Sequence, residues 1–174
     1  MMNETLQTIL SRKSVKKYKP DAVPKELIEQ IVRAGMQAPT GLNKQSPIIL
    51  AVTDKQVRDQ LSKLNAGKDP FFRSDPFYGA PCVLVVLAKK DVFTHVYDGS
   101  LVMGNMLLAA HSLGLGACWI HRAKETFEVE EGKEILRSLG LNPDEYEGIG
   151  NCIVGYADMQ PAEKPRKENW VYYI

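Results

Sequence analysis

One segment of this 174-residue chain is apolar at every position, the run Cys82-Val83-Leu84-Val85-Val86-Leu87. A strand with one face in water alternates apolar and polar residues, so a run without alternation predicts a strand that is covered on both faces. The helix expected over 97–113 is also apolar on most sides, and its small residues Gly99, Gly104, Ala109 and Ala110 allow close packing. Both features favour a sheet that is buried between layers of helices.

The other elements are expected to alternate along the chain. Capping residues and helical spacing predict helices after Asn3, Pro24 and Asp54, and an amphipathic helix over 125–139. Short apolar segments predict strands over 48–53, 117–120 and 148–155. No repeat or linker divides these elements, so we expect one domain over 1–174. This order predicts a three-layer α/β or α+β sandwich on a mixed sheet of four or five strands.

The tail from residue 160 onward has a different character. Pro161 and Pro165 separate it from the preceding elements, and it carries the basic residues Lys164, Arg166 and Lys167. It ends in the five apolar, strand-forming residues 170–174. Such residues are poorly accommodated in water, so we expect them to add to a sheet edge, either of this chain or of a partner.

Charge and cysteine content exclude several classes of protein. Lys and Arg number 22 and Asp and Glu number 21, so the net charge of +1 creates no overall field that would attract nucleic acid or an anionic membrane. The three cysteines lie far apart and form no C-x-x-C pair, which favours a reducing compartment. The first residues show no secretory signal, and the apolar run 80–88 is too short to span a bilayer. We therefore expect a soluble, cytoplasmic protein.

A basic turn follows the first expected helix. Arg12, Lys13, Ser14 and Lys16 place a guanidinium group, two ammonium groups and a hydroxyl within five residues. Arginine binds phosphate oxygens in a bidentate manner, lysine adds a point charge, and serine donates a hydrogen bond. The turn therefore suits a phosphate monoester, although such a charge run is more often a solvated surface.

A polar loop over 39–45 is the second candidate site. It concentrates amide and hydroxyl groups beside Gly41, which permits close approach of the backbone. Such a loop can recognise the edge of a heteroaromatic ring. The alternative is a helix end followed by an ordinary turn.

Several other motifs are absent. Gly114 and Gly116 follow an expected helix instead of preceding one, and the third glycine of the dinucleotide-binding motif is missing, so we exclude that motif. No nucleophile elbow or phosphate-binding P-loop occurs. His95, His111 and His121 lack metal-ligand spacing, and Cys118 beside Trp119 favours packing over nucleophilic catalysis. We expect no metal and no catalytic side chain.

Taken in order, these segments resemble the nitroreductase family of FMN-dependent oxidoreductases. Residues 11–18 are similar to the family motif R-R/H-S-x-R-x-F/Y, and residues 38–45 are similar to A-P-S/T-x-x-N-x-Q. Asp98, Asn105, the segment 114–116 and the ending Gly155-Tyr156 with 164–167 extend the resemblance over nearly the whole chain except 55–76. Two departures stand out: the family's Pro-Trp after the loop is Ser46-Pro47-Ile48, and Lys16 replaces the commoner arginine.

The resemblance implies a fold and a set of cofactor contacts. The fold would be α+β, a three-layer sandwich with a mixed, mostly antiparallel sheet. The protein would be a homodimer with FMN in the interface and the tail 160–174 wrapped onto the partner. The implied FMN contacts are Arg12, Lys13 and Ser14 to the phosphate with Lys164 and Arg166 from the tail, Lys16 near the pyrimidine side of the ring, Pro39, Thr40, Gly41, Asn43 and Gln45 from the other subunit, and Trp119, Ile120 and His121 near N5.

The activity that the resemblance implies is the transfer of hydride from NADH or NADPH through FMN to an electron-poor acceptor in a ping-pong sequence. The acceptor is a nitroaromatic, a quinone or a flavin, and Lys16 would support the negative charge of the reduced ring. Two alternatives stay open: a flavin-storage protein without turnover, and a specialised flavin dehalogenase or dehydrogenase. The unmatched segment 66–78, with Phe71, Phe72, Phe77 and Tyr78, is expected either to cover the active site or to form interface core.

Overall fold

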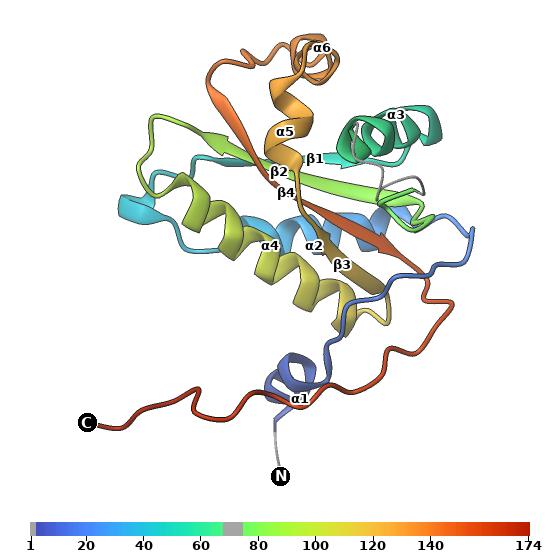
Figure 1. Cartoon of the computed structure of the whole chain (residues 1–174), viewed down its shortest axis with the longest axis vertical. Coiled ribbons are helices and arrows are strands. Elements are labelled where there is room, and N and C mark those ends of the chain that lie inside the picture. Colours follow the sequence, from blue (N-terminus) through green and yellow to red (C-terminus); the bar gives the residue numbers. More distant parts are fainter. Residues whose placement is uncertain (1–2, 68–74) are drawn as a thin grey trace.

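Figure 1 shows the computed structural model of the chain, in which residues 3–67 and 75–174 are described. Its sheet has four strands, β1 (Pro47–Val52), β2 (Cys82–Lys89), β3 (Gly116–Ile120) and β4 (Tyr146–Gly155), in the order β1-β2-β4-β3. Every neighbouring pair is antiparallel. The expected mixed sheet has one parallel contact in the described residues, the isolated bridge between Ser14 and Ala117. The predicted α+β class and mostly antiparallel sheet are confirmed.

Helices cover both faces of the sheet (Figure 1). One layer holds α2 (Lys25–Met36) and α4 (His95–Ser112), and the other holds α3 (Lys55–Ala66), α5 (Ala123–Glu128) and α6 (Glu130–Ser138). The central strand β2 serves both layers, because Leu84 and Val86 pack in the cluster with α2 and α4 whereas Val83 and Val85 pack in the cluster with α3, α5 and α6. The run without alternation thus marks a strand buried on both faces, as expected.

The amino-terminal segment lies along the free edge of β3. Helix α1 (Glu4–Ser11) is capped by Asn3, as the sequence predicts, and the chain then continues in extended form. The amide of Val15 donates to the carbonyl of Ala117 at 3.1 Å, and the amide of Lys19 donates to the carbonyl of Tyr156 at 2.9 Å. A Cβ added at Gly116 would lie 2.9 Å from the Val15 side chain, so this glycine permits the close approach.

The prediction of a single helix over 125–139 is wrong. The chain forms α5 and α6, which are separated at Val129, a residue with the extended backbone angles φ −80° and ψ 156°. A Cβ at Gly132 would collide with the backbone of Thr126 and Phe127, so the first turn of α6 packs directly against α5. The break turns both helices so that Phe127 and Leu136 reach the same core.

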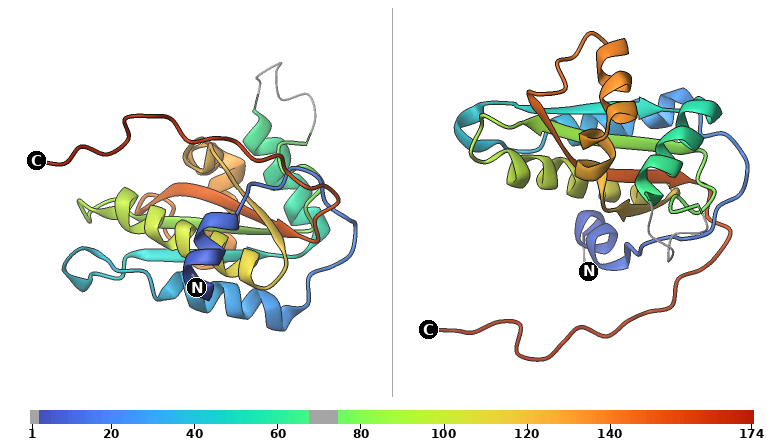
Figure 2. Two further views of the ribbon diagram at one scale, coloured as in Figure 1. Left: turned by 90° about the horizontal axis from the view of Figure 1, so that it is seen from below. Right: turned by 45° about the horizontal axis from the view of Figure 1, so that its top comes forward.

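The structure of the tail also differs from the prediction. Residues 158–174 form no strand, and Trp170–Ile174 are exposed. Figure 2 shows the tail leaving the body of the molecule after β4 and running past α1. The expectation that residues 170–174 add to the edge of this chain's own sheet is therefore wrong. The alternative, a sheet edge of a partner, stays a prediction.

Candidate functional site

The basic turn is held in an extended conformation by the core on one side and by β3 on the other. Val15 and Tyr18 are buried, and the Tyr18 hydroxyl donates to the Val15 carbonyl at 2.7 Å. Ser14 and Lys16, which flank Val15, are exposed. The local sequence therefore directs apolar side chains inward and a hydroxyl and an ammonium group outward, next to the edge of the sheet.

The charges of the basic turn are not neutralised by any carboxylate of the described residues. In residues 3–67 and 75–174, no carboxylate lies within 4.0 Å of the charged groups of Arg12, Lys13 or Lys16. Lys17, by contrast, forms an ion pair of 2.7 Å with Asp158. Three cations without counter-charges beside the Ser14 hydroxyl are chemically suited to bind an anion such as a phosphate.

The predicted segment 119–121 lies at the carboxyl end of β3, whose beginning contacts the basic turn at Ala117. Trp119, Ile120 and His121 continue the strand beyond Ala117, the residue that bridges to Ser14. Their backbone is fixed from behind by two buried amides: Asn151 Nδ2 donates to the Ile120 carbonyl at 3.3 Å, and Asn65 Nδ2 donates to the His121 carbonyl at 2.8 Å. The structure thus attaches the basic turn to β3 at Ala117, two to four residues before the predicted segment 119–121.

The polar loop is anchored to the first turn of helix α4. Asp98, which is 3% exposed, accepts a hydrogen bond from the Gly41 amide at 3.0 Å and another from the Thr94 hydroxyl at 2.9 Å. Within the loop, the Gln45 amide donates to the Thr40 hydroxyl at 3.1 Å and the Gln45 side chain donates to Asn43 Oδ1 at 3.0 Å. These contacts give the loop a defined shape.

The loop backbone is also unusual in its angles. Leu42, Asn43 and Gln45 have φ values of 51°, 54° and 48°, in the left-handed region that favours glycine. Non-glycine residues keep such angles only where surrounding contacts impose them, and these residues are concentrated at binding sites. The loop after Pro39, which includes the short 3-10 helix η1 (Gly41–Asn43), is therefore more than an ordinary turn.

The two halves of the predicted site lie at opposite ends of α4. The loop is tied to Asp98 in the first turn, whereas Ser11, just before the basic turn, contacts His111 Nε2 at 2.7 Å in the last turn. Residues 98 and 111 of one helix are separated by about 20 Å at the α-helical rise. Within one chain, Thr40, Asn43 and Gln45 therefore do not meet Arg12, Ser14 and Lys16.

The remaining predicted residues, Lys164 and Arg166, lie on the exposed tail. Neither forms an ion pair with the described part of the chain.

Two residues near the site were not among the predicted contacts. Tyr78 lies against Lys16, with 5.8 Å between the Lys16 Nζ and the ring centroid, and Asp75 holds the turn that carries Tyr78. Phe77, expected in a lid or an interface, is instead fully buried in the chain's own core. Phe71 and Phe72 lie outside the described residues. The sequence Asp75-Pro76 followed by Gly79 is a turn signal that could have indicated this corner.

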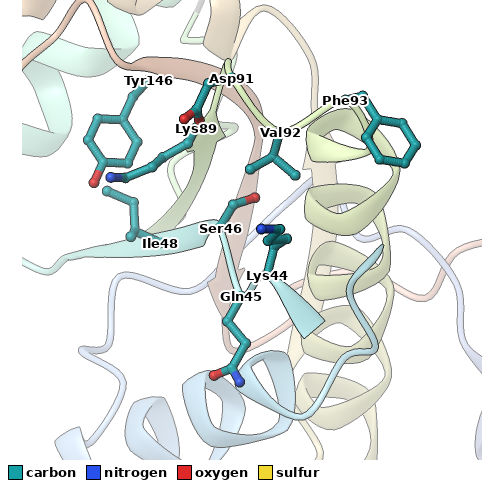
Figure 3. A pocket seen from close by; sticks show the side chains of 9 residues that line it. All are labelled: Lys44, Gln45, Ser46, Ile48, Lys89, Asp91, Val92, Phe93 and Tyr146. Carbon is teal, nitrogen blue, oxygen red and sulfur yellow. The ribbon is translucent and has the colours of Figure 1, made fainter. Parts of the chain in front are cut away.

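A hollow of about 470 Å³ adjoins the polar loop (Figure 3). Gln45 lines it, together with apolar and aromatic side chains and the ammonium groups of Lys44 and Lys89. The Ser46 hydroxyl at its wall is buried and has no hydrogen-bond partner in the described residues. The full lining is Lys44, Gln45, Ser46, Ile48, Lys89, Asp91, Val92, Phe93 and Tyr146. The loop therefore borders a space in which an organic molecule with polar groups can lie.

Other chemistries find less support. Cys82, Cys118 and Cys152 are free and buried, and burial raises the pKa of Cys82 to about 12, so this thiol stays protonated near neutral pH. In the part of the chain that the structure describes, no three His, Cys, Asp or Glu residues are grouped so that they could hold a metal ion. No helix among those residues is both long and apolar enough to cross a membrane.

Comparisons with known proteins identify the family of this chain. The model of the nitroreductase family matches residues 9–156. A Methanothermobacter thermautotrophicus protein with the provisional name NADH dehydrogenase/NAD(P)H nitroreductase is 30% identical over 162 residues, which cover 93% of this chain and 80% of that protein. The FMN reductase (NAD(P)H) of Bacillus subtilis is 25% identical over 182 residues, covering 95% and 70%.

A solved structure agrees over the whole length. The nitroreductase with bound FMN from Bacteroides fragilis superposes with a TM-score of 0.91 and 27% identity, covering 99% of this chain and all of that one. The fold, the matched residues 9–156 and the sequence identity to curated relatives all point to the same assignment. This chain belongs to the nitroreductase family.

Proposed function

We propose that this protein is an FMN-dependent oxidoreductase that passes hydride from NADH or NADPH to an electron-poor acceptor such as a nitroaromatic, a quinone or a flavin. The observation that carries the proposal is the group of three cations, Arg12, Lys13 and Lys16, which form no ion pair among the described residues and lie beside the beginning of β3. The relatives that are named FMN reductase and the FMN-bound neighbour support the choice of cofactor. FMN supplies the hydride chemistry when it is bound, so the chain needs no nucleophile of its own.

The residues of the basic turn fit the FMN phosphate. Arg12 offers two parallel N–H donors, Lys13 a point charge and Ser14 an exposed hydroxyl, which together suit a dianion on an otherwise apolar edge. Lys16 follows two residues later, on the same exposed side of the extended segment as Ser14. We assign it to the ring, where an ammonium group stabilises negative charge that collects on reduction. Trp119, Ile120 and His121 would then border the reactive side of the ring.

A second copy of the chain would complete the site. The polar loop lies about 20 Å from the basic turn of its own chain, a separation given by the length of α4. Its predicted FMN contacts are Pro39, Thr40, Gly41, Asn43 and Gln45. Helices α1 and α4 also leave large apolar side chains exposed, among them Leu6, Leu10, Tyr97 and Leu101. Exposed apolar side chains of this size are favourable contacts for a partner surface. We therefore propose a homodimer in which the loop of one subunit reaches the flavin held by the other.

The tail fits the same assembly. Its apolar end, 170–174, is exposed, and its basic residues Lys164 and Arg166 form no ion pair among the described residues. Wrapping onto the partner would bury the apolar end and bring Lys164 and Arg166 to the phosphate. We further propose that residues 1–174 act as one domain, and that the protein is cytoplasmic, in keeping with its three free cysteines.

One experiment tests the activity. The purified protein is mixed with FMN, desalted and examined by visible absorbance, first alone and then under anaerobic conditions with NADH and with NADPH. We expect flavin bands that survive desalting and bleach with at least one nucleotide, which would also identify the donor. Retained bands that bleach with neither nucleotide would favour storage over turnover, and loss of the flavin on desalting would overturn the cofactor assignment.

A further inference from the structure

We propose that Tyr78 is a positioning residue for Lys16: its ring holds the Lys16 ammonium in place and thereby sets how strongly the protein favours reduced over oxidised flavin. This inference rests on the proposed function, because it concerns the flavin that Lys16 would face. It assigns a role to a residue outside the basic turn and the polar loop, in the corner that leads into β2.

The contact itself is a cation–π interaction. The Lys16 Nζ lies 5.8 Å from the centroid of the Tyr78 ring, within the range in which a ring face attracts an ammonium group. The neighbouring Lys17 turns instead to Asp158, at 2.7 Å. An aromatic ring holds a cation without cancelling its charge, whereas a carboxylate would neutralise it. The ring therefore holds the Lys16 ammonium in place without neutralising it, and this positive charge can stabilise an anionic flavin ring.

The Tyr78 backbone is constrained in an unfavourable conformation. Its φ of 53° lies in the left-handed region, which is a genuine outlier for a bulky residue. A residue keeps such a conformation only where the surrounding structure imposes it, and such positions are concentrated at functional sites. The side chain is 41% exposed, so burial of the ring in this chain does not account for the constraint.

The constraint comes from Asp75. Its carboxylate accepts hydrogen bonds from the amides of Phe77 at 2.9 Å and Gly79 at 2.7 Å, the residues on either side of Tyr78. The Ser62 hydroxyl also donates to this carboxylate, at 2.5 Å, and so does the Arg58 guanidinium. One carboxylate thus fixes both flanks of Tyr78 to helix α3.

Arg58 and Phe77 complete the support. Arg58 is buried and donates from Nε to the Ala80 carbonyl at 3.0 Å, which ties the exit of the turn to the same helix. Phe77 is fully buried under the Arg58 guanidinium, 5.5 Å from its ring centroid. The ring of Tyr78 is therefore presented from a rigid corner to the extended segment that carries Lys16, which β3 holds independently.

The test measures the two-electron reduction potential of bound FMN. Removing the ring frees the lysine side chain, so we expect Tyr78→Asn to weaken the preference for reduced flavin about tenfold, which lowers the potential by about 30 mV. Asparagine tolerates the left-handed backbone and so preserves the turn. Tyr78→Leu provides a second ring-less variant without a polar group, and Tyr78→Phe keeps the ring and should restore the wild-type potential.

Two matched lysine variants locate the effect. Lys16→Met should lower the potential by at least as much as Tyr78→Asn, and adding Tyr78→Asn to it should change nothing further, because the two residues act as one unit. Lys17→Met removes the same charge from the next position and should leave the potential within error of the wild type. In the apoprotein, a double-mutant cycle on the free energy of unfolding should show coupling between residues 16 and 78 but none between 17 and 78.

The outcomes separate this inference from the proposed function. Unchanged potentials in both ring-less variants, with a lowered potential in Lys16→Met, would overturn the role of Tyr78 and leave the function intact. An unchanged potential in Lys16→Met, with flavin bound and reducible, would overturn the role of Lys16 and of Tyr78 with it. Failure of the wild type to retain flavin would defeat the proposed function itself.

Discussion

Asp98 and Gly41 are joined by a hydrogen bond of 3.0 Å between a buried carboxylate on α4 and a backbone amide of the polar loop. The second oxygen of Asp98 accepts from Thr94, so both carboxylate oxygens are used. This contact decides where the loop's amide and hydroxyl groups lie relative to α4. The shape of the loop is thus a property of the helix as well as of its own residues.

Replacing Asp98 with alanine should loosen the loop. The change leaves the Gly41 amide and the Thr94 hydroxyl without their acceptor, which costs about 1–3 kcal/mol of unfolding free energy. Urea denaturation measures this loss, and fluorescence titration with FMN should show weaker binding. Asp98→Asn is the matched control, because it keeps one carbonyl oxygen and should lose less of both. Equal stability and FMN affinity in Asp98→Ala and the wild type would show that the contact is dispensable.

Arg12→Ala should weaken FMN binding more than the loss of an ordinary surface charge. Hydrogen bonds to charged groups contribute about 1.5–3 kcal/mol, so the dissociation constant should rise by roughly ten- to a hundredfold. Arg33→Ala is the control, because that arginine lies on α2 and outside the proposed site. Titration of the apoprotein with FMN measures both. An unchanged FMN affinity in Arg12→Ala would refute the placement of the phosphate at the basic turn.

Much of the fold could be predicted because its signals are local. The apolar run 82–87 identified the central strand, and Asn3 and Asp54 cap their helices as expected. The break at Val129 could not be predicted, because no glycine or proline lies there and the interruption arises from Gly132 packing against the backbone of Thr126. A contact between two helices leaves no trace in the periodicity of either one.

The candidate site likewise has parts with local sequence signals and parts that depend on contacts between distant residues. The motifs around Arg12 and Asn43 are contiguous in sequence, so the order of their residues is enough to indicate their chemistry. The sequence predicts for Tyr78 only a lid or an interface, because its position depends on Asp75 and on Lys16, which lies 62 positions away in the chain. No local pattern shows that a turn before β2 and a strand-like segment after α1 meet.

Acidification should release the corner that carries Tyr78. Burial alone would raise the pKa of Asp75, but hydrogen bonds from Arg58, Ser62 and the amides of Gly79 and Phe77 outweigh it and lower the pKa below its usual value. A lowered pKa contributes stability above the ordinary carboxyl pKa of about 3.9, and this contribution is lost as the pH falls through the lower native value.

Urea unfolding of the wild type and of Asp75→Asn at a series of pH values tests this linkage. The variant should be less stable at neutral pH, and the difference should shrink as the pH falls below about 4. Asp144→Asn is a suitable control, since that carboxylate is exposed and its ion pair with Lys133 is long, at 3.8 Å. A stability difference that stays constant down to acidic pH would mean that the Asp75 charge makes no contribution.

Removing residues 170–174 should weaken the dimer without unfolding the subunit, because these side chains lie outside the core of their own chain and their exposed apolar surface favours a partner. Sedimentation velocity at several protein concentrations should show dissociation of the truncated protein under conditions in which the full chain remains dimeric, and circular dichroism should be unchanged. Replacing Lys164 and Arg166 with glutamine in the full chain separates the two roles of the tail. That variant should keep the dimer and lose FMN affinity. A truncated protein that stays a flavin-loaded dimer would show that the apolar end is not part of the interface.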